Sequence, residues 1–164
     1  MIRFCMDQVY RLCVVLAGSA MVLISLIVPY GVFTRYVLNS ASSWPEPGAI
    51  LLSIVLTFFG AAAGYRVGLH MRVTFVRDRL PSIPQRAADI ASELLMGLVA
   101  LFMIIKGWGL CNTTWNQSIA EFPFLSVGAT YLPIPLGGIC LLLFVAERLL
   151  IGAPVSDHDA VAFE

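Results

Sequence analysis

Residues 12–37 read LCVVLAGSAMVLISLIVPYGVFTRYV, and this stretch decides the fold class. Its only charged residue is Arg35, near the end of the run. A helix needs about 20 mostly apolar residues to cross the hydrocarbon core of a bilayer, so this run is long enough. Comparable apolar runs predict further transmembrane helices at 48–65, 87–110 and 132–151. The chain is therefore predicted to be an all-α membrane protein, with residues 1–164 forming one integral membrane domain.

The composition agrees with a membrane setting. Hydrophobic residues make up 59% of the chain, and the mean hydropathy is +0.88. Charged residues make up 12%, which is about half of the roughly 25% found in soluble domains. The first apolar run is too long for a signal peptide, so we expect it to be retained as a membrane helix.

The basic residues predict the orientation in the membrane. Of the 10 lysines and arginines, only Arg35 and Lys106 fall on one side of the predicted helices. The rest lie before the first helix, between the second and third, or at the end of the fourth. Because basic residues collect on the cytoplasmic side, both termini are predicted to be cytoplasmic.

The segment between the second and third predicted helices favours an interfacial helix over about 68–80. An apolar stripe at helical spacing consists of Leu69, Val73, Val76 and Leu80. Three arginines flank the stripe and would bind anionic lipid headgroups, namely Arg72, Arg77 and Arg79. A short connector whose charges only set the topology is the alternative. The acidic tail at 152–164 is predicted to be disordered.

Small residues mark where helices can approach closely. Gly60 and Gly64 form a small-xxx-small pattern, which is typical of close helix packing. The same smooth surface would also suit a partner chain. By contrast, Gly137 and Gly138 are expected to loosen the first turns of the fourth helix.

Glu93 is the acidic residue that most resembles a membrane-buried site. With Arg86 and Asp89 it forms a polar stripe at the base of the third helix. We expect Glu93 to stay at the membrane surface and to pair with Arg86 or Arg66. A buried ion or proton site is the alternative, because a carboxylate inside a membrane is usually functional.

The residue pattern predicts neither catalysis nor a cofactor. The sequence has no Walker motif, and its histidines, His70 and His158, do not form the pair that a haem would need. The four cysteines have neither metal-ligand nor disulfide spacing. The polar groups expected at mid-membrane depth are hydroxyls that can bond to their own helix: Ser25, Ser53 and Thr57. We therefore predict a non-catalytic bundle with no metal, no substrate site and no nucleic-acid partner.

Several short motifs, in this order, resemble a known family. They are RYVLN at 35–39, WPE at 44–46, FGAA at 59–62, RVGLHMRV at 66–73 and YLPIPLG at 131–137. Together they resemble the DctQ-type small membrane subunit of TRAP transporters, the tripartite ATP-independent periplasmic transporters. The sequence departs from the family pattern at Pro47 and Thr74, where the family often has acidic residues.

The resemblance implies a scaffold rather than a transport site. It implies two protein partners in a bacterial inner membrane: a large permease subunit with the substrate and sodium sites, and a periplasmic solute-binding protein. The complex would take up an organic acid by sodium symport. It also implies structural or interface roles for Arg35, Trp44, Glu46, Gly60, Gly64, Arg66 and His70. We expect Glu46 to pair near Arg35 at the outer surface, and Arg66 and His70 to orient the interfacial helix.

Two other classes of protein fit the same composition. A membrane anchor of a respiratory enzyme would bind quinone or haem, and a purified sample would show this by its absorbance. A small self-assembling channel would conduct ions in liposomes by itself. The lack of a polar pore-lining stripe disfavours the channel.

Overall fold

The computed structural model describes residues 2–40, 42–68 and 82–151. This part of the chain contains the helices α1 (Ile2–Tyr36), α2 (Pro45–Val67), α4 (Ser82–Thr114), α5 (Val127–Thr130) and α6 (Pro133–Ile151). Within it, four helices are long and apolar enough to cross a membrane, as the sequence predicted. The predicted interfacial helix, apart from Gly68, and the tail at 152–164 lie outside the described residues, so those predictions are not tested.

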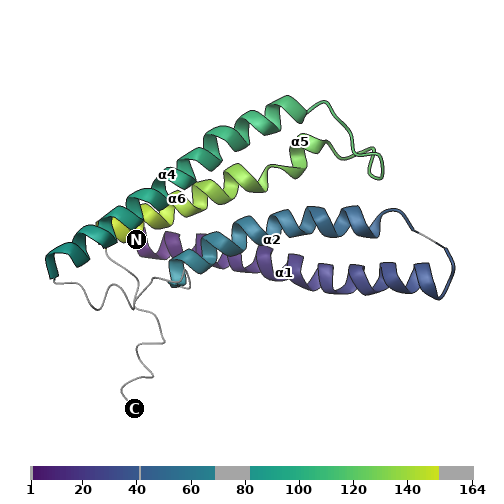
Figure 1. Ribbon diagram of the computed structural model, residues 1–164, viewed down its shortest axis with the longest axis horizontal. Helices are drawn as coiled ribbons and strands as arrows, with labels where there is room; N and C mark the ends of the chain where they lie inside the picture. Colours follow the sequence, from purple (N-terminus) through teal and green to yellow (C-terminus); the bar gives the residue numbers. More distant parts are fainter. Residues whose placement is uncertain (1, 41, 69–81, 152–164) are drawn as a thin grey trace, which may run out of the picture.

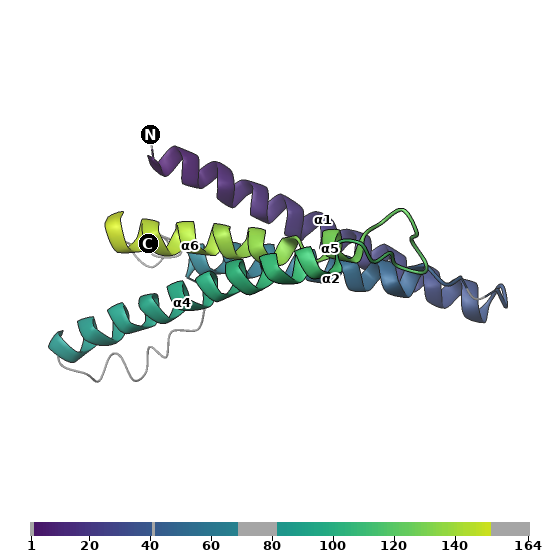
Figure 2. The same cartoon turned by 90° about the horizontal axis from the view of Figure 1, so that it is seen from above.

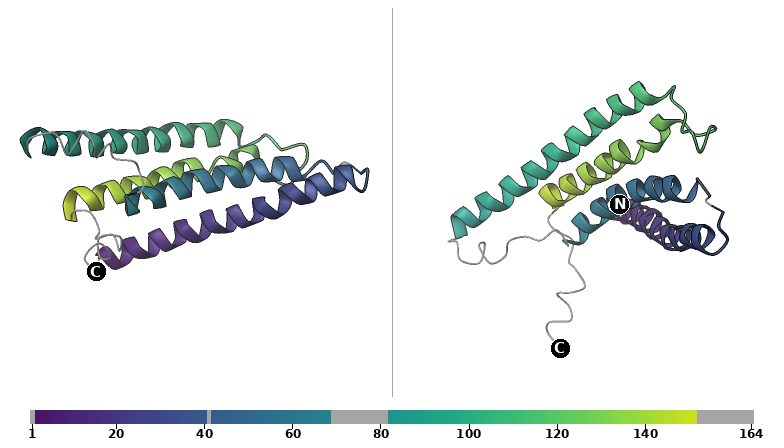
Figure 3. Two further views of the ribbon diagram at one scale, coloured as in Figure 1. Left: turned by 60° about the horizontal axis from the view of Figure 1, so that its bottom comes forward. Right: turned by 45° about the vertical axis from the view of Figure 1, so that its right-hand side comes forward.

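The long helices stand side by side in the order α1, α2, α6, α4 (Figure 1). Figure 2 shows that the start of α1 and the start of α4 are splayed apart. α2 packs between α1 and α6, and α6 packs between α2 and α4. Figure 3 shows α1 and α4 on opposite sides of the molecule. In consequence, the most apolar windows of α1 and α4 are each only 17% buried, against 28% for α2 and 33% for the last span.

The helices alternate in direction, which gives the molecule two distinct ends (Figure 1). The start of α1, the end of α2, the start of α4 and the end of α6 lie together, and we call this the terminal end. The opposite end carries the connections 37–44 and 115–126, and we call it the loop end. The ends of α2 are well defined: Pro45 occupies the first turn, and Gly68 closes the helix with a left-handed φ of +80°.

Two helices are longer than the apolar runs that predicted them. α1 begins at Ile2 rather than at residue 12, and α4 extends over Ser82–Thr114 rather than over 87–110. The added turns of α1 carry Arg3, Asp7 and Arg11 at four-residue spacing, so they are amphipathic and a hydropathy criterion omits them. The short helix α5 was also not predicted. It is capped by Ser126, whose side chain accepts a hydrogen bond from the Gly128 amide at 3.1 Å.

Half of the buried core residues are alanine or cysteine, and they lie where the helices cross. The buried core residues are Cys13, Ala17, Phe59, Ala62, Ala63, Tyr65, Ala100, Leu141, Phe144 and Val145. α6 approaches both of its neighbouring helices closely. A Cβ on Gly137 would lie 2.8 Å from Phe58 Cβ of α2, and a Cβ on Gly138 would lie 3.1 Å from the Ala100 carbonyl oxygen of α4.

Whether Gly137 and Gly138 also loosen the first turns of the helix stays a prediction, but a second role is clear from these contacts. They allow α6 to fit between its two neighbours. Gly60 faces α1, with an added Cβ 3.8 Å from Ala17 Cβ, whereas Gly64 faces open space. The small-residue pattern on α2 thus contributes a packing contact at one of its two glycines.

Candidate functional site

A cluster of charged side chains lies at the terminal end, and all four long helices contribute to it. Its centre is Arg66, in the last turn of α2, which is 9% exposed. Arg66 Nε donates to Glu147 Oε2 at 2.9 Å, and its Nη2 donates to Glu147 Oε1 at 3.0 Å. This two-pronged pairing fixes the geometry of both side chains, because a guanidinium matches the shape of a carboxylate.

Arg66 also reaches α1 and two aromatic rings. Its Nη2 donates to Asp7 Oδ1 at 2.6 Å. The guanidinium carbon lies 5.4 Å from the centre of the Tyr10 ring and 5.5 Å from that of Phe144. At these distances the faces of aromatic rings attract a cation. One side chain therefore joins α1, α2 and α6.

The second half of the cluster joins α4 to the same pair of helices. Glu93 of α4 is 8% exposed and accepts a hydrogen bond from the Tyr65 hydroxyl of α2. Arg148 Nε of α6 lies 3.5 Å from Glu93 Oε1, and its guanidinium carbon lies 5.2 Å from the centre of the Tyr65 ring. On one side of the α2–α6 pair, Arg66 thus contacts α1. On the other side, the neighbouring Tyr65 and Arg148 contact α4.

The charged groups of the cluster pair with one another. Two arginines face three carboxylates, and most of these groups are buried. Burying charges costs desolvation energy, so such a cluster adds little net stability compared with apolar residues. Removing one partner is nevertheless costly, because the others are left buried and uncompensated. We infer that the terminal-end cluster fixes the register of the helices.

The predicted pairing of Glu93 with Arg66 was wrong, and the alternative pairing with Arg86 is not tested. Glu93 is buried and pairs with Arg148 and Tyr65, whereas Arg66 pairs with Glu147 and Asp7. The side chain of Arg86 lies outside the described part of the structure. Sequence reasoning missed Asp7 and Glu147 as partners. One indication of these pairings was available in the sequence: Glu147 and Arg148 are adjacent charges near the end of an otherwise apolar helix.

The hydroxyls expected at mid-membrane depth behave as predicted. Ser25 donates to the Met21 carbonyl at 2.9 Å, Ser53 to Ala49 at 2.8 Å and Thr57 to Ser53 at 2.7 Å. Each bond stays within one helix, four residues back along the chain. These hydroxyls are therefore satisfied locally and do not converge on a common site.

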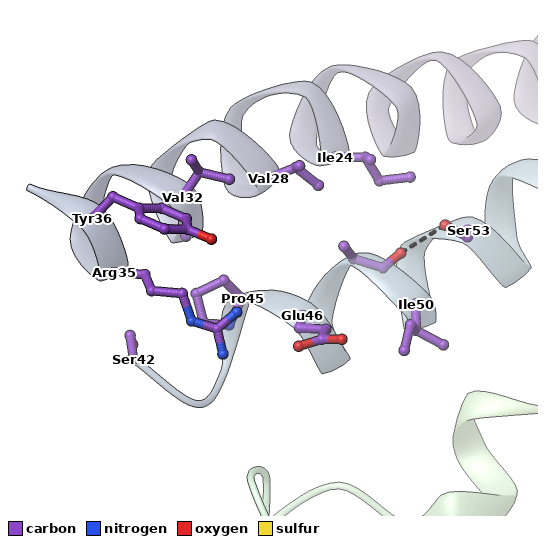
Figure 4. Close-up of a pocket in the computed structure, with 12 residues that line it drawn as sticks. Ile24, Val28, Val32, Arg35, Tyr36, Ser42, Pro45, Glu46, Ile50 and Ser53 are labelled. Atoms are coloured by element: carbon purple, nitrogen blue, oxygen red, sulfur yellow. Dashed lines mark hydrogen bonds between the residues drawn. The ribbon is translucent and has the colours of Figure 1, made fainter. Parts of the chain in front are cut away.

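At the loop end, Arg35, Trp44 and Glu46 come together around the junction of α1 and α2. Arg35 and Glu46 line one pocket of about 520 Å³ (Figure 4). The expected pairing of these two residues was wrong, because among the described residues no ion pair joins them. Trp44 contacts Tyr30 instead, with ring centres 5.7 Å apart. The remaining predicted residues, His70, Arg72, Arg77 and Arg79, lie outside the described residues.

The sequence of this chain is similar to that of a known protein family. Residues 24–153 match the DctQ component of the tripartite ATP-independent periplasmic transporters. The chain belongs to the DctQ family. The resemblance inferred from its motifs is thus confirmed, and DctQ proteins are transport components rather than enzymes. The matched region includes the pocket and every residue of the terminal-end cluster except Asp7 and Tyr10.

Two named relatives agree with the DctQ match. A Haemophilus influenzae protein named as a TRAP transporter small permease protein is 28% identical over 136 residues, which is 83% of this chain and 84% of that protein. The sialic acid TRAP transporter small permease protein SiaQ of Vibrio cholerae is 23% identical over 118 residues. That second match covers 71% of this chain and 66% of SiaQ.

Proposed function

We propose that this DctQ protein is the non-catalytic scaffold of a TRAP transporter and holds a large permease subunit during transport. The observation that carries the proposal is the row of helices pinned at one end by the charged cluster. Such a row is stiff where the cluster joins it and leaves α1 and α4 largely uncovered. A stationary subunit needs both properties: a fixed shape and a broad surface for its partner.

The partner surface that we propose lies on α4. Five of its exposed apolar residues follow alternating steps of four and three: Leu94, Leu98, Leu101, Ile105 and Trp108. This is the spacing of a seam that packs against another helix. Leu94 and Leu98 are 62% and 65% exposed, so nothing in the described part of the chain covers them.

The rest of the transport system is inferred from the family. We propose that the large subunit carries the substrate and sodium sites, and that a periplasmic solute-binding protein delivers an organic acid. Support for an acidic solute comes from the name of the SiaQ relative, which refers to sialic acid. We also propose an inner-membrane location with both termini cytoplasmic, in agreement with the distribution of basic residues.

The α4 surface is tested by truncating its side chains. The triple variant Leu94→Ala, Leu98→Ala, Leu101→Ala should reduce the yield of complex with the large subunit by roughly tenfold or more, because several contacts are lost together. The fold itself should persist, since the three side chains are exposed. Co-purification quantifies the complex, and uptake by the remaining complex should keep its preference among solutes.

A matched control lies on α1. The triple variant Val15→Ala, Val22→Ala, Leu26→Ala removes equally exposed apolar side chains from the opposite side of the molecule. It should leave the yield of complex near that of the unmodified chain. Loss of complex in the α1 variant but not in the α4 variant would contradict the assignment, and a changed solute preference would contradict the scaffold role.

A further inference from the structure

The pocket at the loop end is polar at its mouth and apolar at depth. It lies between the last turns of α1 and the first turns of α2, beside the contact of Gly31 with Pro45 (Figure 4). Ile24 and Arg35, both in its lining, are separated by about 16 Å along the helix at 1.5 Å per residue. The deeper wall is formed by Ile24, Val28, Val32 and Ile50.

Two opposite charges stand at the mouth without satisfying each other. Figure 4 shows Arg35 extending from the end of α1 toward the first turn of α2, where Glu46 lies. Both side chains are exposed, and neither makes an ion pair or a hydrogen bond with another described residue. At the terminal end, by contrast, each arginine of the charged cluster pairs with a carboxylate. The mouth of the pocket therefore has an unused cation and an unused anion side by side.

We propose that this pocket binds a zwitterionic phospholipid whose headgroup carries a primary ammonium. Arg35 donates to the lipid phosphate, for which a guanidinium is well shaped. Glu46 accepts hydrogen bonds from the ammonium group. One acyl chain lies along Ile24, Val28 and Ile50, so the apolar wall meets hydrocarbon while the charges stay at headgroup depth. The proposal needs only the membrane setting and is independent of the scaffold role.

The test is native mass spectrometry of the full-length chain, released from micelles that contain equal amounts of dioleoyl phosphatidylethanolamine and dioleoyl phosphatidylglycerol. The ethanolamine lipid should be retained roughly fivefold over the glycerol lipid, the effect expected of one partly exposed ion pair. Glu46→Gln should bring the two lipids to equal retention. Arg35→Gln should lower the retention of both, because both contain the phosphate.

Two control variants separate the pocket from lipid bound elsewhere. Glu121→Gln removes an exposed carboxylate from the 115–126 connection, and Arg11→Gln removes an exposed arginine at the terminal end. Both should retain the two lipids as the unmodified chain does. The proposal is overturned if Glu46→Gln and Glu121→Gln give the same lipid ratio. It is also overturned if Ser42→Cys, in the pocket lining, cross-links to a co-purifying protein while no ethanolamine lipid is retained.

Discussion

Arg66→Ala is expected to destabilise the folded protein by about 3–5 kcal/mol, because it leaves the buried carboxylate of Glu147 without its partner. Both side chains of this pair are nearly inaccessible, at 8% and 5% exposure. A loss of this size is a large fraction of the 5–15 kcal/mol that stabilises a typical folded domain. The measurement is helix content during titration with sodium dodecyl sulfate in mixed micelles, where the midpoint of unfolding should fall sharply.

Arg11→Ala is the matched control for this loss. Arg11 lies at the same end of the molecule but is exposed, so its removal should shift the midpoint little. A second comparison replaces Arg66 together with both of its carboxylate partners, as Asp7→Asn, Arg66→Met and Glu147→Leu. Stability should recover, since a buried charge set and a well-packed apolar set are often equivalent. Equal midpoints for Arg66→Ala and Arg11→Ala would contradict a central role for Arg66.

Gly137→Ala is expected to destabilise the crossing of α6 with α2 by about 1–3 kcal/mol, the usual cost of overpacking. The added Cβ would lie 2.8 Å from Phe58 Cβ and 3.2 Å from the Phe58 carbonyl carbon and oxygen. Since part of this contact is with the backbone, rotation of a side chain does not relieve it. The clash must also exceed the gain of about 1 kcal/mol from alanine's higher helix propensity. The same titration measures the change.

Gly64→Ala provides the opposite case. Outside the backbone of α2 itself, no atom of the described residues lies within 4 Å of a Cβ added at Gly64, so we expect only the gain in helix propensity to apply. This variant should be as stable as the unmodified chain or more so. If Gly137→Ala and Gly64→Ala unfold at the same detergent fraction, then the close approach at Gly137 does not stabilise the helix crossing as described.

The four transmembrane helices could be predicted because the membrane imposes a length and an apolar composition on each span. The additional turns of α1 could not be predicted in this way, since Arg3, Asp7 and Arg11 make that segment amphipathic. The family was predicted from short motifs, and the match over residues 24–153 confirms it. A uniformly hydrophobic segment therefore indicates clearly that a transmembrane helix is present, but it indicates poorly where that helix begins and ends.

The partners within the charged cluster could not be read from the sequence. Glu93 had several candidate cations near the same membrane surface, and sequence spacing alone does not say how α4 is rotated against α6. The packing of α4 against α6, for example at Gly138 and Ala100, sets that rotation. For the same reason, Arg35 and Glu46 were expected to pair with each other, whereas they line one pocket at the α1–α2 junction and, among the described residues, no ion pair joins them.

The scaffold role is tested most directly by purifying the tagged chain from its native membrane in a mild detergent and identifying what accompanies it by mass spectrometry. We predict a large multi-helix permease in a 1:1 ratio with the chain, retained by the unmodified protein and reduced in the α4 triple variant. Recovery of the chain alone as a homo-oligomer, or together with a haem-bearing or flavin-bearing partner, would contradict the scaffold role.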